Sequence, residues 1–118
     1  GKERANLINE VLKTVEFFFI DFDYPKELLL WKSLSFEEIK KNLIQISNEL
    51  KKISENDFNS FKIKEILDNL SGKNKGPYFW PLRVALSGKE ASPPPFDLAE
   101  AFGKDFTLKL INKAIQKL

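Results

Sequence analysis

A single arginine at position 83 stands among apolar residues, just before a stretch rich in proline. The segment from Trp80 to Phe96 reads W-P-L-R-V-A-L-S-G-K-E-A-S-P-P-P-F. A guanidinium is planar and permanently charged, so it can donate two parallel hydrogen bonds to a base edge or a phosphate. Residues 92–95 present carbonyl groups, one hydroxyl and flat pyrrolidine rings on a stiff, extended backbone. Because proteins that read RNA sequence grip unstacked bases with rigid apolar surfaces and arginine, these residue types predict an RNA contact.

Two other interpretations of this segment stay open from the residues alone. Arg83 could be an ordinary helix-surface arginine paired with Asp97 or Glu100. Pro93-Pro94-Pro95 could be a plain rigid connector, or a peptide that docks on an SH3-like partner. The second option would make the chain a helical protein-interaction module that docks through its proline-rich loop.

Three lysines near this segment are candidates for contact with phosphate groups. Lys73, Lys75 and Lys89 lie before and inside the proline-rich region, and their default interpretation is that of solvated surface lysines. Residues 72–118 hold 8 basic and 4 acidic side chains, whereas residues 1–71 hold 11 and 13. A modestly positive half suits a domain that touches phosphates at a few points, although a lysine-rich surface explains the imbalance almost as well.

The composition excludes several kinds of catalytic site. The sequence has no cysteine and no histidine, which removes thiolate chemistry, the usual metal ligand and the best proton carrier near neutral pH. No glycine-rich loop is present to cradle phosphates. The neighbouring acids Glu37 and Glu38 occupy the predicted first turn of a helix, where the helix dipole favours negative charge. We therefore expect no catalytic residue and no metal site in this chain.

The length of 118 residues is that of one domain, or of one domain with the edge of another. No apolar run approaches the roughly 20 residues that a membrane-spanning helix needs. The sequence contains no methionine. We therefore expect this chain to be a piece of a longer protein.

Apolar residues recur at helical spacing along the whole chain, and no segment alternates long enough to indicate a strand. The predicted fold class is all-α, with irregular loops around the prolines. An S-x-x-E capping box at Ser35 and Glu38 opens the clearest helix, and Pro25 is placed to begin a shorter one. Residues 72–77 are predicted to be a basic linker. The predicted helices cover residues 7–15, 35–53, 57–70, 82–86, 95–103 and 105–118.

The same periodicity predicts which side chains form the core. Phe79 and Trp80 are expected to be core residues or the floor of a groove. The helix of residues 57–70 is expected to bury Phe58, Phe61, Ile66 and Leu70, and the last helix Leu108, Ile111, Ile115 and Leu118.

The chain resembles the C-terminal anticodon-binding region of bacterial glutamyl-tRNA synthetases. Members of that family carry a P-L-R-x-A-L-[ST]-G motif followed by a short proline-containing loop and phenylalanine, as residues 81–96 do here. Lys2-Glu3-Arg4-Ala5 with Leu7 is similar to the family's E-R-x-x-x-L helix, and Phe17-Phe18-Phe19 to the aromatic run after it. Phe102-Gly103-Lys104-Asp105 is similar to its L-G-K-E segment. The resemblance spans nearly the whole chain.

The resemblance implies an irregular helical domain of the type found in class I aminoacyl-tRNA synthetases. It implies that residues 1–24 are the edge of a preceding anticodon-binding subdomain and that residues 25–118 form the C-terminal anticodon-binding domain. It also implies where RNA is contacted. By position, the anticodon-reading residues are Arg83, Ser92, Pro93, Pro95 and Arg4.

The family's reaction implies the partners of this region. The parent enzyme would join glutamate to its tRNA, using ATP and Mg²⁺ bound in an N-terminal catalytic domain that this chain lacks. This chain would bind the anticodon loop of the tRNA and would itself need no cofactor. The resemblance further implies a monomeric cytoplasmic enzyme.

Overall fold

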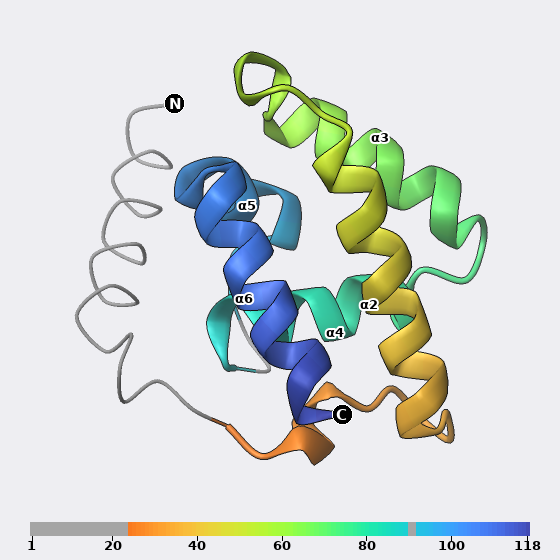
Figure 1. The fold of residues 1–118 in the computed structure, drawn as a ribbon. Helices are drawn as coiled ribbons and strands as arrows, with labels where there is room; N and C mark the ends of the chain where they lie inside the picture. Colours follow the sequence, from red (N-terminus) through yellow and green to blue (C-terminus); the bar gives the residue numbers. More distant parts are fainter. Residues whose placement is uncertain (1–23, 90–91) are drawn as a thin grey trace.

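The computed structural model describes residues 24–89 and 92–118. Within these ranges the chain forms α-helices and short 3-10 helices and contains no strand, which confirms the all-α prediction. The helix expected over residues 7–15, the aromatic run at 17–19 and Arg4 lie outside the described residues. The elements (Figure 1) are η1 (Lys26–Leu29), α2 (Phe36–Lys51), η2 (Glu55–Asp57), α3 (Ser60–Ser71), α4 (Gly76–Ser87), α5 (Pro95–Phe102) and α6 (Lys104–Lys117).

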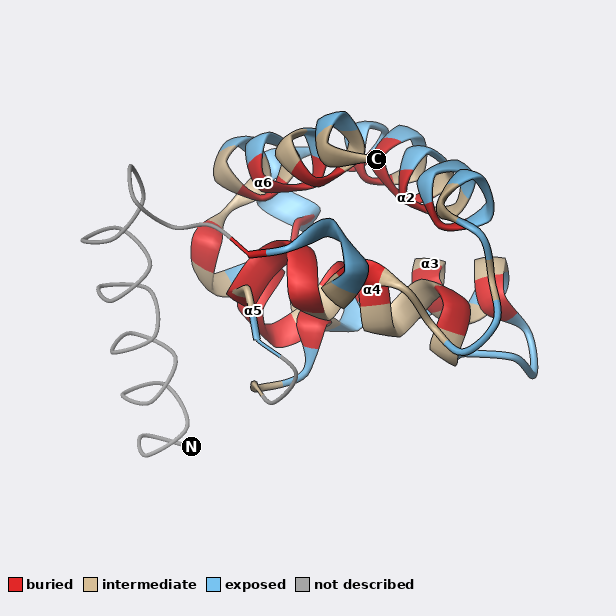
Figure 2. Cartoon of the chain, turned by 90° about the horizontal axis from the view of Figure 1, so that it is seen from below, coloured by how far each residue is buried: buried red, intermediate tan, exposed pale blue. Residues whose placement is uncertain are grey.

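The helices form two layers around one core. Helices α2 and α6 lie side by side in one layer, and α3, α4 and α5 form the other, with their buried faces turned towards each other (Figure 2). Fully buried aliphatic side chains from both layers fill the space between them. The largest are Leu29, Ile39, Leu43, Ile46, Leu50, Ile63, Leu67, Leu82, Leu86, Leu98, Leu110 and Ile111.

Helix α2 is closed at both ends by side chains. At its start, the Ser35 hydroxyl oxygen accepts a hydrogen bond from the backbone N–H of Glu38 at 3.2 Å, as the capping box predicts. At its end, the ammonium of Lys104 donates to the carbonyl of Lys51 at 2.9 Å. A cation at a helix C-terminus also interacts favourably with the helix dipole. Lys104 thus joins the beginning of α6 to the end of α2.

Helix α3 begins later than the sequence predicts, and one predicted core residue is wrong. Asn59 caps the helix by accepting from the N–H of Lys62 at 2.9 Å, so the residues near position 57 stay outside it. Phe61 was expected to be buried but is 77% exposed. Ile63 sets the buried face, and Phe61 lies about 200° around the helix from it because each residue turns the helix by about 100°. Phe58 is buried as predicted, and the two other apolar residues of the expected face, Ile66 and Leu70, are half-buried.

Helix α4 is twice as long as predicted, because two prolines do not interrupt it. It begins at Gly76 rather than Leu82, so the last two residues of the expected linker, Gly76 and Pro77, belong to the helix. Pro77 falls in the first turn, where its missing N–H is not needed. Pro81 lies inside the helix and leaves the Pro77 carbonyl without its helical partner. The side-chain amide of Asn42 on α2 donates to that carbonyl at 3.1 Å and so replaces the lost bond.

The last helix presents a different buried face from the predicted one. Of the four apolar residues expected to face the core, only Ile111 is fully buried and the others are half-buried. The fully buried positions include Thr107, Leu110 and Ala114. Burial of Thr107 is possible because its hydroxyl donates to the Ala99 carbonyl of α5 at 3.2 Å, which satisfies the polar group.

Candidate nucleic-acid interface

Arg83 lies on a partly exposed face of α4 together with two aromatic side chains. Phe79 and Trp80 precede Arg83 by four and three residues, so the three side chains share one side of the helix. All three are half-buried, whereas the neighbours Leu82, Val84 and Leu86 are fully buried, as predicted. We call Phe79, Trp80 and Arg83 the α4 face.

Arg83 forms no ion pair with the acidic side chains of the described residues. Within residues 24–89 and 92–118, no ion pair joins Arg83 to Asp97 or Glu100. The structure therefore does not support the interpretation of Arg83 as half of a surface salt bridge with one of these acids. An arginine without such a partner can meet an external anion or base edge without first breaking an internal bond.

The aromatic rings of the α4 face are fixed by contacts with other elements. The Trp80 indole N–H donates to the Leu28 carbonyl at 2.9 Å, and the ring lies 5.7 Å from that of Trp31 between centroids. The Trp31 ring in turn lies against Gly76, where any side chain would overlap it. Phe79 packs edge-to-face against Phe96, with 6.4 Å between ring centroids. The face is thus a rigid surface before any ligand arrives.

The loop after α4 is bonded to the end of the helix. Gly88 has a φ of 69°, a left-handed conformation that ends the helix. The Ser87 hydroxyl donates to the Arg83 carbonyl at 2.7 Å or to the Lys89 carbonyl at 3.1 Å. The same oxygen accepts the Lys89 N–H at 3.1 Å. These bonds fix the point at which the chain leaves α4.

The proline segment bends at Pro93, has polyproline-like backbone angles at Pro94 (φ −53°, ψ 143°) and enters a helix at Pro95. The Ser92 hydroxyl donates to the Pro93 carbonyl at 2.9 Å, which shapes the segment from within. Ser92 and Pro93 are half-buried and Pro94 is exposed, but Pro95 is buried and begins α5. Among the residues predicted to read RNA here, Ser92 and Pro93 are therefore more accessible than Pro95.

The contact between Phe79 and Phe96 places the end of the proline segment beside the α4 face. Phe96 directly follows Pro95, and Phe79 is one helical turn before Arg83 on the same side of α4. The segment and Arg83 therefore belong to two neighbouring elements of the same layer (Figure 2). A cation and fixed rings are groups that bind unstacked bases, whereas the Pro93 and Pro94 carbonyls already accept hydrogen bonds within the chain.

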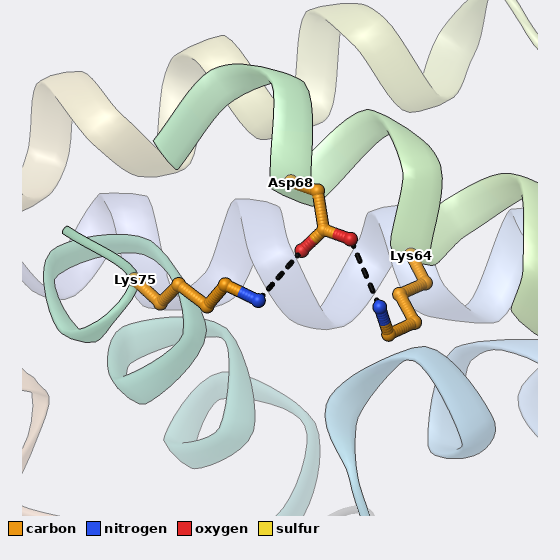
Figure 3. Close-up of polar contacts among 3 residues, drawn as sticks. All are labelled: Lys64, Asp68 and Lys75. Atoms are coloured by element: carbon orange, nitrogen blue, oxygen red, sulfur yellow. Dashed lines mark hydrogen bonds and ion pairs between the residues drawn. The ribbon is translucent and has the colours of Figure 1, made fainter. Parts of the chain in front are cut away.

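Lys75, a predicted phosphate contact, is engaged by an acid of α3 (Figure 3). Its ammonium lies 3.3 Å from one carboxylate oxygen of Asp68, while Lys64 donates to the other oxygen at 2.9 Å. The hydrogen bond from Lys64 is the largest influence on the pKa of Asp68. Burial opposes it, but together with the contact from Lys75 and the charges of both lysines it holds the pKa of Asp68 below its ordinary value. Lys73 and Lys89, the other predicted phosphate contacts, have exposed side chains.

A concave region lies on the other side of α4 from Arg83, where the helix packs against α2. This hollow of about 440 Å³ is lined by residues that include Asn42, Gln45 and Tyr78. The Tyr78 hydroxyl donates to the Gln45 side-chain oxygen at 2.8 Å, and Asn42 bonds to Pro77. These polar groups hold α4 on α2, so we assign the hollow a structural role.

The described part of the chain contains no group of three acidic, histidine or cysteine residues that could hold a metal ion. None of its helices has the length and apolar character that crossing a membrane requires.

Sequence reasoning missed the residues that hold the site together. Trp31 and Gly76 form a close contact across 45 positions of chain, and Phe79 and Phe96 meet across two helices. A glycine at the start of a helix beside a cluster of aromatics was the available signal for the first contact. Nothing in the local pattern identified the second.

Comparison with known proteins agrees with this geometry. The model of the anticodon binding domain family matches residues 1–115. The chain is 31% identical over 121 residues to a glutamate–tRNA ligase of Clostridium botulinum strain Hall, covering 98% of this chain and 24% of that protein. It is 34% identical over 123 residues to the glutamate–tRNA ligase of Flavobacterium psychrophilum, covering 99% of this chain and 23% of the relative. The corresponding protein of Clostridium tetani is 32% identical over 120 residues, with coverages of 98% and 24%.

The chain thus spans about a quarter of the length of the curated relatives that it matches. No solved structure gives a significant match. The family match extends over almost the whole sequence and includes the α4 face and the proline segment. This chain belongs to the anticodon binding domain family.

Proposed function

We propose that this chain is the tRNA anticodon-recognition region of a glutamate–tRNA ligase. Membership of the anticodon binding domain family and the similarity to glutamate–tRNA ligases over nearly all of the chain support this function. The observation on which it rests is the placement of Arg83. Arg83 is half-buried on the side of α4 that carries Phe79 and Trp80, the Phe79–Phe96 contact brings the end of the proline segment to that helix, and no described acid forms an ion pair with Arg83.

In this proposal Arg83 reads one anticodon base through its planar fork of donors. Ser92 and Pro93 contact a neighbouring base, and Pro95, which is buried, shapes the segment rather than touching much RNA. Arg4 reads a further base. Lys73, Lys75 and Lys89 contact phosphates, and Lys75 must first exchange the Asp68 carboxylate for a phosphate.

The remaining proposals concern the parent enzyme. The chain would itself be non-catalytic and would use binding energy far from the reaction to orient the tRNA and reject wrong anticodons. ATP, glutamate and Mg²⁺ would bind in the part of the protein that precedes this region. We further propose a monomeric, cytoplasmic enzyme, with a boundary between anticodon-binding subdomains near residue 24.

The test is the affinity of Arg83 variants for anticodon stem-loop RNAs of glutamate tRNA. For the unchanged chain, we expect one anticodon substitution to weaken binding by roughly tenfold or more, the usual cost of a lost bidentate base contact. Arg83→Ala should bind the matched RNA more weakly and should no longer distinguish it from that substituted RNA. Fluorescence anisotropy at fixed salt measures both affinities.

Arg83→Lys is the matched control, because it keeps the charge and removes the planar fork. We expect it to retain part of the affinity but little of the discrimination. Equal losses for matched and substituted RNA in both variants would reduce Arg83 to a phosphate contact. Absence of salt-sensitive RNA binding by the unchanged chain would refute the function and would favour a protein-docking module instead.

A further inference from the structure

We propose that Phe79 is a stacking surface for one unpaired RNA base, with Lys75 and Arg83 placed to bind the phosphates or base edges on either side. This inference rests on the proposed function and adds to it a contact in which an aromatic ring holds the base. It follows from the exposure and orientation of Phe79 and from the spacing of its charged neighbours.

The Phe79 ring is accessible and already oriented. It is half-buried on the α4 face, packs against the core along one side, and meets Phe96 edge-to-face at 6.4 Å. A ring held in this way loses little conformational freedom when a base stacks on it. Stacking of a base on an aromatic side chain is a major source of affinity for single-stranded RNA and tolerates any base.

Positive groups accompany this ring along the helix. The Lys75 ammonium lies over the Phe79 ring, 5.7 Å from its centroid, so a base that stacks on that face takes its place, and Arg83 follows one turn later. Lys75, Phe79 and Arg83 are spaced four residues apart, so they form a row on one side of α4 about 12 Å long at 1.5 Å per residue. A cation, a ring and a second cation in a row match the alternation of phosphate, base and phosphate in a nucleotide chain.

A second phenylalanine offers a matched control. Phe36 is also half-buried and also lies beneath a lysine, with the Lys26 ammonium 4.9 Å from its ring centroid. It is the first residue of α2, in the other layer of the fold. A general effect of removing a surface ring near a lysine should therefore appear equally in Phe36→Leu and Phe79→Leu.

The experiment combines these variants of the 118-residue chain with stem-loop RNAs that carry one abasic nucleotide at each loop position in turn. For the unchanged chain we expect one abasic position to weaken binding by about tenfold. Phe79→Leu should lose about the same factor with the intact RNA and nothing further with that abasic RNA. Phe79→Tyr, which keeps the ring, and Phe36→Leu should both behave like the unchanged chain.

Two results would overturn stacking. One is that the loss of affinity from Phe79→Leu adds fully to the loss from the abasic nucleotide at every loop position. The other is that Phe79→Leu binds the intact RNA as tightly as the unchanged chain does. Circular dichroism checks that the variant is folded. Should it not fold, the ring-proton resonances of Phe79 in the unchanged chain decide, because a stacked base must shift them and the abasic RNA must not. If Arg83→Ala loses discrimination but Phe79→Leu has no effect, stacking is refuted and the proposed anticodon recognition stands. If the unchanged chain binds no RNA, both proposals are refuted.

Discussion

Two basic side chains near the α4 face have contrasting surroundings. Arg83 has no ion pair to Asp97 or Glu100 in the described part of the chain, whereas Lys75 is paired with Asp68, which also binds Lys64 (Figure 3). An incoming phosphate competes with a carboxylate for Lys75 but not for Arg83. At this scale, the arginine is therefore better placed for strong recognition, and Lys75 for an adjustable contact.

The two lysines around Asp68 should make stability depend on pH. An unfolded chain protonates this carboxyl near its ordinary pKa of 3.8, and the folded chain does so only at lower pH. The stabilisation is therefore complete above about pH 5 and is lost as the pH falls through the lowered pKa of the folded state. Asp68→Asn should cost at most about 1 kcal/mol at neutral pH, because the side chain is 34% exposed.

Urea unfolding at several pH values measures this effect. The stability difference between Asp68→Asn and the unchanged chain should shrink between pH 5 and pH 2. Asp105→Asn, at an exposed carboxylate in the first turn of α6, is the control. Because Asp105 lies outside the Lys64–Asp68–Lys75 network, its stability difference from the unchanged chain should not show this pH dependence. A constant difference for Asp68→Asn across the whole range would contradict the assignment.

The sequence predicted the surroundings of Arg83 better than those of Lys75. Burial of Leu82, Val84 and Leu86 follows from the local order of apolar residues, and it leaves Arg83 on the opposite side. The pairing of Lys75 with Asp68 depends on how the turn after α3 directs the chain. The order of residue types does not predict the path of that turn, so the sequence indicated an ordinary surface lysine at position 75.

Among the elements, α4 is the one that positions the site, and it depends on a bond from its neighbour. Pro81 removes a helical hydrogen bond, and Asn42 replaces it from α2 at 3.1 Å. One side-chain amide therefore both completes α4 and ties it to the other layer. The length of α4 matters for the site, because Phe79 and Trp80 belong to the part before Arg83 that the sequence did not predict as helix.

Loss of the Asn42 amide should be costly only while Pro81 is present. Asn42→Ala should destabilise the fold by about 1–2 kcal/mol, because the Pro77 carbonyl then has no partner. In a Pro81→Ala background residue 81 regains its N–H, so the same change should cost much less. Thermal and urea unfolding of the four variants measures the coupling, and strictly additive losses would show that the helix does not use the bond in this way.

Local signals predicted some helix boundaries and misled at others. The start of α2 follows from Ser35, whose hydroxyl oxygen accepts the backbone N–H of Glu38 three residues later. The start of α4 does not, because Pro81 alone indicates a boundary and only Asn42, 39 residues away in sequence, makes it tolerable. Phe61 was misplaced for a related reason, since Asn59 rather than the apolar pattern decides where α3 begins.

At the scale of the whole molecule, the positive charge of residues 72–118 is divided between the two layers. Of their 8 basic side chains, four lie in or beside α4 and the proline segment, including the exposed Lys73 and Lys89, and the other four lie on α6. The two-layer arrangement separates the α4 face from the outer surface of α2 and α6 (Figure 2). Binding should therefore depend on salt through a few contacts rather than through a broad positive surface.

The number of phosphate contacts can be measured from this salt dependence. Each phosphate neutralised on single-stranded RNA changes the slope of log affinity against log salt by about −0.7. The double variant Lys73→Ala/Lys89→Ala should make that slope shallower by roughly 1.4 and leave base preference unchanged. Lys40→Ala/Lys109→Ala, at exposed positions of α2 and α6, is the charge-matched control and should not change it. Equal slopes for both double variants would remove Lys73 and Lys89 from the interface.

A single hydroxyl connects Lys89, where the chain leaves α4, to the peptide unit of Arg83. The N–H of Lys89 donates to the Ser87 hydroxyl oxygen, and the Ser87 hydroxyl donates to the Arg83 carbonyl. A movement of the backbone at Lys89 is therefore transmitted through these two hydrogen bonds to the backbone of Arg83. Under the proposed function, an RNA that displaces the backbone at Lys89 would therefore also displace the backbone of Arg83, so contacts made at the two positions would not be independent of each other.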